Sequence, residues 1–252
     1  MLINKLKFEI KALFFSIFEL IIYKKPLNLK IQDFIFIIFL KTRYQSIQFK
    51  DGTLIKKKCD NNIIDSTIKI KKLKIKNYYK SYLDIGCSEG FFLIEAFKKK
   101  CSDITGIDIQ DSRLKVAKIL VNNWNCAKNI RLIKKDIRNF KISRKFDTVT
   151  CLSVGHHFHG NRNHDTWKII RNNNLYNKEY KNLINFFKKL SNLTKRKAYI
   201  EYCYEFDEKV RDFDPKKLQE IIRKLKIFKS FNFYCYTQYT QKKIRAIYLG
   251  KN

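Results

Sequence analysis

Between residues 84 and 108, acidic residues and glycines are spaced in a way that could bind a nucleoside. An apolar run leads into Asp84 and is followed by Gly86, Gly90 and a helical stretch. Glycine permits a sharp turn after a strand and close approach of a ligand to the backbone. A helix starting after Gly90 would add a partial positive charge, which suits a ligand carboxylate. The order D-x-G-x-S-x-G is not the G-x-G-x-x-G fingerprint of dinucleotide sites, which disfavours NAD and leaves an adenosine ligand without phosphates.

A second candidate for chemistry is a histidine cluster in the stretch SVGHHFHGNRNHD, which holds His156, His157, His159 and His164. It follows an apolar run and should lie at the carboxyl edge of the sheet, where open α/β folds bind ligands. Three interpretations stay open. An imidazole could remove a proton from a substrate hydroxyl. Several imidazoles could bind a metal, although H-H-x-H-x4-H is no established ligand spacing. The cluster could also be a polar loop without chemistry.

The elements that must position these residues begin at position 81. Short apolar runs alternate there with helical stretches, which predicts βαβ units and a parallel sheet. Two further runs near the end of the chain predict an antiparallel hairpin. The expected strands are 82–85, 104–107, 130–133, 146–152, 198–202, 228–236 and 244–249, and the expected helices are 91–99, 111–124, 178–191 and 215–225.

Three segments are expected along the chain. Residues 1–45 form an N-terminal helical extension that packs on the main domain, or else meets a membrane surface or a partner. Residues 46–80 form a hairpin and a basic linker. Asp51-Gly52 predicts a type I′ turn there, and the alternation at 68–76 predicts a half-buried strand or an extended linker. Residues 81–252 form the α/β domain.

Composition narrows the class of protein. The 252 residues carry a net charge of +31, which attracts polyanions and makes a nucleic-acid partner one interpretation and a solvated surface the other. The chain has an odd number of cysteines, seven, without a C-x-x-C pair, which favours a reducing, cytoplasmic compartment. We expect neither a membrane span nor a secretory signal.

These features together resemble the class I S-adenosylmethionine-dependent methyltransferases. The first motif of that family matches at Asp84, Gly86 and Gly90, with Ser88 in place of the middle glycine. The resemblance implies a Rossmann-like, mostly parallel seven-stranded sheet with a C-terminal antiparallel hairpin. It also implies a set of cofactor-binding residues: Asp84, Gly86, Ser88 and Gly90 around the methionine part, Asp108 and Ile109 at the ribose, Asp136 and Ile137 at the adenine, and Ser153 near the transferring methyl.

A narrower resemblance is to the tRNA wobble-uridine methyltransferase-like group, carried by the segments 44–53, 83–92, 146–149 and 153–157. It implies O-methylation of a modified tRNA uridine, with the ordinary or a carboxylated form of S-adenosylmethionine. It favours His157 as the base, with His156 as second choice. The alternatives are a methyltransferase acting on a small metabolite or lipid, and a catalytically degenerate Rossmann-like protein that binds nucleic acid.

Overall fold

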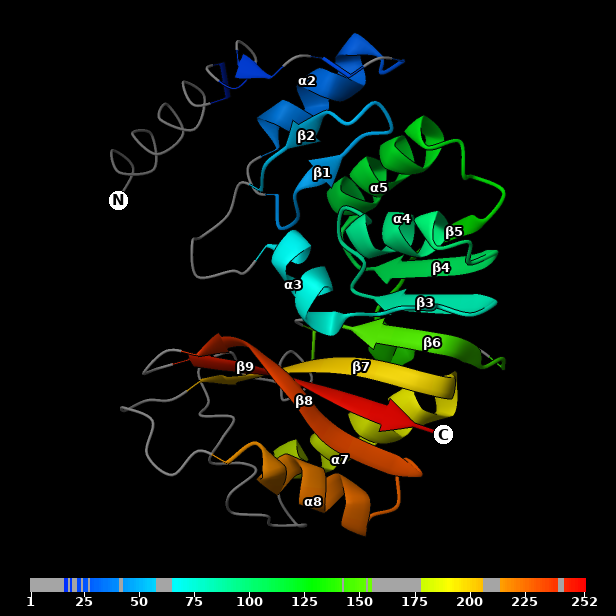
Figure 1. Ribbon diagram of the computed structural model, residues 1–252, viewed down its shortest axis with the longest axis vertical. Helices are drawn as coiled ribbons and strands as arrows, with labels where there is room; N and C mark the ends of the chain where they lie inside the picture. Colours follow the sequence, from blue (N-terminus) through cyan, green and yellow to red (C-terminus); the bar gives the residue numbers. More distant parts are fainter. Residues whose placement is uncertain are drawn as a thin grey trace.

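The computed structural model describes residues 16–17, 19, 22–23, 25–26, 28–40, 43–57, 65–141, 143–152, 154–155, 178–205, 214–239 and 243–252. Figure 1 shows a twisted sheet with helices on both faces. The helices are α2 (Ile31–Phe39), α3 (Ser66–Leu73), α4 (Phe91–Lys98), α5 (Asp111–Asn123), the 3₁₀-helix η1 (Ile137–Asn139), α7 (Lys178–Leu193) and α8 (Lys216–Lys224). The strands are β1 (Ile47–Gln48), β2 (Leu54–Ile55), β3 (Ser81–Ile85), β4 (Asp103–Asp108), β5 (Ile130–Lys134), β6 (Phe146–Cys151), β7 (Thr194–Glu205), β8 (Ser230–Tyr239) and β9 (Lys243–Lys251).

The main sheet has seven strands in the order β5-β4-β3-β6-β7-β9-β8. Strands β3 to β7 pair parallel with one another, whereas β9 pairs antiparallel with both β7 and β8. The predicted Rossmann-like methyltransferase sheet is therefore confirmed. Because the chain order reverses between β4 and β6, β3 lies at a switch point where open α/β sheets bind ligands.

Two hydrophobic cores cover the faces of this sheet. One core packs α7 and α8 against the sheet through residues such as Leu183, Phe187 and Ile222. The other joins α4 and α5 to α2, α3 and the β1–β2 hairpin through residues such as Phe34 and Leu73. In Figure 1, α2 lies above α5, the hairpin lies to the left of α5, and α3 lies below the hairpin. The residues before β3 therefore extend one of the two layers.

The expectation of a strand or extended linker at 68–76 is wrong, because most of this segment forms α3. Asp65 caps the helix by accepting a hydrogen bond from the Thr67 amide. The buried residues are Ser66, Lys69 and Leu73, which are three and four positions apart and share one helix face. The alternating pattern predicted the wrong element because it placed Lys69 on a solvent-facing side, whereas Lys69 is buried against the sheet.

The hairpin around Asp51-Gly52 forms, but the predicted type I′ turn is wrong. Gly52 has a φ of +89°, whereas Asp51 is not in the left-handed region. The Gly52 amide donates to the Phe49 carbonyl at 3.1 Å. Residues 49–53 connect the two strands, and such longer connections favour a type I turn followed by a left-handed glycine.

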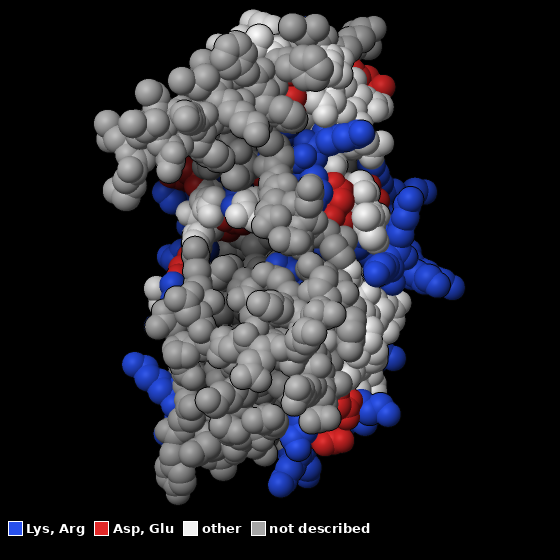
Figure 2. Space-filling view, turned by 90° about the vertical axis from the view of Figure 1, so that its left-hand side faces the viewer, with Lys and Arg blue, Asp and Glu red and all other residues white. Residues whose placement is uncertain are grey.

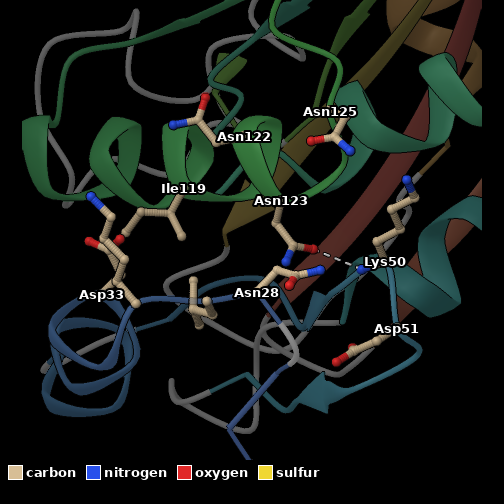
Figure 3. Close-up of a pocket in the computed structure, with 10 residues that line it drawn as sticks. Asn28, Asp33, Lys50, Asp51, Ile119, Asn122, Asn123 and Asn125 are labelled. Carbon is tan, nitrogen blue, oxygen red and sulfur yellow. Dashed lines mark hydrogen bonds between the residues drawn. The ribbon is translucent and has the colours of Figure 1, made fainter.

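A pocket of about 500 Å³ lies between α5 and the hairpin. Figure 3 shows Asn122 and Asn123 on the α5 side and Lys50 and Asp51 on the hairpin side. The Lys50 amide donates to Oδ1 of Asn123 at 2.9 Å, which ties the two elements together. No residue predicted to bind the cofactor lines this pocket. Within the described residues, no helix combines the length and the hydropathy that a membrane crossing requires.

Lys69 anchors α3 through buried charges. Its Nζ lies 2.8 Å from Oε2 of Glu201 on β7, and Nη1 of Arg245 on β9 lies 3.4 Å from the same oxygen. Thr237 on β8 donates to Oε1 of Glu201 at 2.5 Å. Burial lowers the pKa of Lys69, while the Glu201 carboxylate opposes that shift. This cluster joins a helix outside the α/β domain to three strands of the sheet.

We predict that Lys69→Ala lowers the free energy of unfolding by about 3 kcal/mol, because it removes the ammonium that lies 2.8 Å from a fully buried carboxylate. Urea denaturation would measure the change. Lys71→Ala, on the exposed face of the same helix, is the matched control and should stay within about 0.5 kcal/mol of the parent. Equal effects of the two substitutions would contradict an anchoring role for Lys69.

Candidate cofactor site

The glycine turn lies at the end of β3, beside the carboxyl end of β4 (Figure 1). The amides of Gly86 and Cys87 both donate to the carbonyl of Ile107, at 2.8 and 3.0 Å. Gly86 has a φ of +74°, and a Cβ atom there would lie 2.2 Å from Cγ2 of Val154. Gly90, with a φ of +88°, is the N-cap of α4. Position 86 therefore needs glycine both for its backbone angle and for space.

Asp108 ends β4 and is oriented by two backbone amides. Its Oδ2 accepts from the Ser88 amide and its Oδ1 from the Gln110 amide, both at 2.9 Å. An ionised carboxylate offers about four lone-pair positions, so both oxygens can accept further bonds from a ligand. The carboxylate therefore has a fixed direction and remaining capacity to bind a vicinal diol.

Asp84 is buried and has one carboxylate oxygen without a hydrogen bond among the described residues. Its Oδ1 accepts from the Thr150 hydroxyl at 2.6 Å, whereas Oδ2 has no partner there. Burial raises the pKa of Asp84 to about 7, and nearby Asp108 adds to the rise. A buried acceptor of this kind is costly unless a ligand pairs with it. The free oxygen suits a cationic group such as an ammonium.

Ser88 adopts the conformation of the glycine that it replaces, with a φ of +51°. A side chain in this region costs about 1 kcal/mol. The Ser88 hydroxyl donates to Oε2 of Glu89 at 2.5 Å, so it is engaged within the turn. The expected contribution of Ser88 to the site is therefore its backbone amide, which orients Asp108.

Glu89 is a buried carboxylate that the sequence analysis missed. Its Oε1 accepts from the Tyr44 amide at 2.9 Å, and burial raises the pKa of its carboxyl. Beside it, Oε1 of Gln45 accepts from the Phe91 amide at 2.9 Å. The Arg113 guanidinium lies 3.8 Å from the centre of the Tyr44 ring. Residues 43–46, here named the N-terminal strap, thus close on the glycine turn. The available signal was an acidic residue at 89, inside a turn between two glycines.

The other predicted cofactor residues lie after β4 and β5. Ile109, next to Asp108, is 58% exposed, so it presents an apolar surface beside the carboxylate. Asp136 binds the Arg138 guanidinium at 2.6 and 2.9 Å, and these hydrogen bonds lower the pKa of Asp136. Ile137 is buried in the core beneath α7. The Asp136 carboxylate is thus already paired, which leaves backbone and Ile109 as the surfaces that an adenine could meet.

Ser153 and the four histidines, including His156 and His157, lie outside the described residues. The described residues that flank Ser153 and His156 are Leu152, Val154 and Gly155. Because the Val154 side chain lies against Gly86, the chain after β6 returns to the glycine turn.

The described residues fit S-adenosylmethionine. Asp84 offers a buried acceptor for an ammonium, Asp108 an oriented acceptor for ribose hydroxyls, and Gly86 the left-handed backbone conformation with which the turn begins. A pyrophosphate-binding G-x-G-x-x-G fingerprint starting at Gly86 would need glycine where this chain has Ser88 and Phe91. The arrangement suits a nucleoside with a charged amino-acid tail.

Similarity to known proteins agrees with this geometry. The chain is 33% identical over 98 residues to "Ubiquinone biosynthesis O-methyltransferase" of Saccharophagus degradans, covering 38% of this chain and 37% of that protein. It is 35% identical over 78 residues to the protein of the same name in Pseudomonas aeruginosa, covering 31% of this chain and 33% of the relative. The matched segments thus span about a third of these relatives' length.

The fold is also found in a solved structure. The crystal structure of the N-terminal domain of EvdMO1, obtained in the presence of SAH and D-fucose, has a TM-score of 0.60 and 10% identity, covering 90% of this chain and 99% of that one. At this identity the likeness concerns the fold alone.

We predict that Gly86→Ala lowers the free energy of unfolding by about 2 kcal/mol more than Gly52→Ala, because only position 86 combines a left-handed backbone with a steric clash. Gly52 is the matched control, since it has a φ of +89° and no atom within 4 Å of its missing Cβ. Urea denaturation compares the two variants. Adding Val154→Ala to Gly86→Ala should recover part of the loss, and no recovery would contradict the clash.

The family described as "Methyltransferase domain" matches residues 76–232, which is more than half of the chain and includes the glycine turn and both buried aspartates. The expectation of a narrower tRNA-modifying group has no counterpart among these matches, whereas the expectation of the enzyme class is confirmed. This chain belongs to the methyltransferase domain family.

Proposed function

We propose that this protein transfers the methyl group of S-adenosylmethionine to a hydroxyl oxygen of a small organic molecule. The observation that carries the proposal is the match to relatives named as O-methyltransferases of ubiquinone biosynthesis. A small organic molecule thus replaces tRNA as the first choice of substrate.

The cofactor residues that we propose are those of the glycine turn and the two strand ends beside it. Asp84 would pair with the ammonium of the methionine part, and Asp108 would accept the ribose hydroxyls. Gly86 and Gly90 would let the cofactor lie against the backbone, and the Ser88 amide would keep Asp108 in position.

The adenine would lie over Ile109, bordered by the backbone of Asp136 and Ile137. Bound S-adenosylmethionine supplies a methyl group that is already activated on sulfur. The protein has to align the acceptor, exclude water and remove one proton. We propose His157 as the base that takes the proton as the oxygen–carbon bond forms and the sulfur–carbon bond breaks, with His156 second and Ser153 near the methyl.

The second candidate is methylation of a modified tRNA uridine, with the ordinary or a carboxylated cofactor. A basic surface favours it: residues 66–80 contain six lysines and no acidic residue. Five of these lysines are exposed, namely Lys71, Lys72, Lys74, Lys76 and Lys80. Figure 2 shows that blue side chains outnumber red ones on the described part of one side of the molecule. Such a surface attracts a phosphate backbone.

Transfer of tritium from labelled S-adenosylmethionine distinguishes the two acceptors. We expect label in the organic-soluble fraction of a metabolite and lipid extract and none in bulk tRNA above a heat-killed control. Label that appears in tRNA and is released by nuclease would favour the second candidate.

We predict that Asp108→Ala weakens binding of S-adenosylhomocysteine about 100-fold, since two hydrogen bonds to a carboxylate contribute roughly 3 kcal/mol. Isothermal calorimetry measures the affinity. Asp111→Ala is the matched control, because its carboxylate is exposed and pairs with Lys134 instead. Equal affinity of Asp108→Ala and the parent would remove Asp108 from the site.

We predict that His157→Ala lowers kcat about 100-fold or more at saturating cofactor, because a positioned general base typically contributes that much. Binding of S-adenosylhomocysteine should not change, and His164→Ala serves as the comparison. Unchanged turnover of His157→Ala would shift the role to His156.

A further inference from the structure

We propose that Thr150 and Tyr82 are positioning residues of the cofactor site, whose hydroxyls form a hydrogen-bond chain that holds Asp84 as a carboxylate able to receive a cationic ligand group. This inference rests on the proposed placement of the cofactor ammonium at Asp84. It adds Tyr82 of β3 and Thr150 of β6 to the residues proposed for the site.

The chain runs across neighbouring strands on one face of the sheet. Asp84 and Thr150 are paired residues of β3 and β6, and Tyr82 lies two residues before Asp84 on the same face. The Thr150 hydroxyl donates to Oδ1 of Asp84 at 2.6 Å, and the Tyr82 and Thr150 hydroxyl oxygens lie 2.5 Å apart. Since Thr150 gives its proton to Asp84, Tyr82 must donate to Thr150. The direction of the chain therefore favours negative charge on Asp84.

Outside the hydroxyl chain, the groups that face Asp84 do not stabilise that charge. They are Asp108 from β4, the phenol of Tyr78, and the thiols of Cys87 and Cys151. Each is neutral or negative at neutral pH. Among the described groups that act on Asp84, the Thr150 hydroxyl is the one that lowers its pKa.

A pH dependence of ligand binding follows from this balance. With a pKa of about 7, Asp84 is partly protonated in the free protein at neutral pH. A ligand ammonium binds the ionised form, so affinity should rise as the pH increases through 7, and binding near pH 7 should release a fraction of a proton. Loss of the Thr150 hydroxyl removes the interaction that lowers the pKa, so this rise should move to higher pH.

The test uses calorimetric titration of the cofactor-free protein with S-adenosylhomocysteine at several pH values. We expect Thr150→Val to weaken binding about tenfold at pH 6.5 and less than twofold at pH 8.5, because a hydrogen bond to a charged group contributes about that much. Tyr82→Phe should act in the same direction with a smaller effect, and Thr150→Ser should restore the parent's behaviour. An unchanged pH dependence of Thr150→Val would overturn the proposal.

Thr148→Val is the matched control. Thr148 is a buried threonine on the same strand, two residues from Thr150, and its hydroxyl donates to the Tyr78 carbonyl at 3.1 Å. Thr148→Val should lose about as much stability as Thr150→Val without changing the pH dependence of ligand binding. If both valine variants changed this pH dependence equally, the role of Thr150 would be structural and the proposal wrong.

Titration of the ¹³C-labelled Asp84 carboxyl by NMR, assigned with Asp84→Asn, gives a readout that needs no ligand. The midpoint should rise in Thr150→Val and stay unchanged in Thr148→Val. If S-adenosylhomocysteine failed to bind the parent protein, the proposed site would fail. The NMR titration would still decide whether the hydroxyl chain controls Asp84, and an unchanged midpoint would refute it.

Discussion

The site depends on the hydrogen bonds that join the glycine turn to β4. Two consecutive amides, those of Gly86 and Cys87, share the Ile107 carbonyl, and the next amide, that of Ser88, binds the Asp108 carboxylate. These bonds continue the parallel pairing of β3 with β4 beyond the last paired residues. As a result, the carboxylates of two separate strands are held at one edge of the sheet. Backbone amides set the direction of the Asp108 carboxylate, whereas the Thr150 hydroxyl binds that of Asp84.

The segment before the methyltransferase domain completes this edge. The N-terminal strap binds the turn through Glu89 and the start of α4 through Gln45. Arg43, at the beginning of the strap, is fully buried and donates to the carbonyls of Ile37, Ile38 and Lys56, and it also pairs with Glu19. The strap is therefore held by α2 and the hairpin. The glycine turn and the start of α4 are thus contacted by residues outside the segment 76–232 that matches the family.

Charge is used in two ways in this chain. Exposed lysines give the surface its positive field, whereas Lys69 and Arg245 are buried against Glu201. Composition alone is enough to predict the positive field of the exposed lysines. It cannot identify the buried basic residues, because a lysine in an alternating pattern looks the same in the sequence whether it faces water or a carboxylate from another strand.

The sequence by itself determined the sheet, its helices and the positions of Asp84, Gly86, Gly90 and Asp108, because hydrophobic periodicity and glycine spacing are local properties of the chain. Only the tertiary structure decided that Glu89 is buried, since its partner Tyr44 lies 45 residues away. The same holds for Thr150, whose hydroxyl reaches Asp84 only after β3 and β6 pair. The helical form of α3 was also decided by long-range contact, because its buried lysine is stabilised by Glu201, 132 residues further along. Local pattern specifies which elements form, whereas the burial of polar groups depends on partners that only the folded chain brings together.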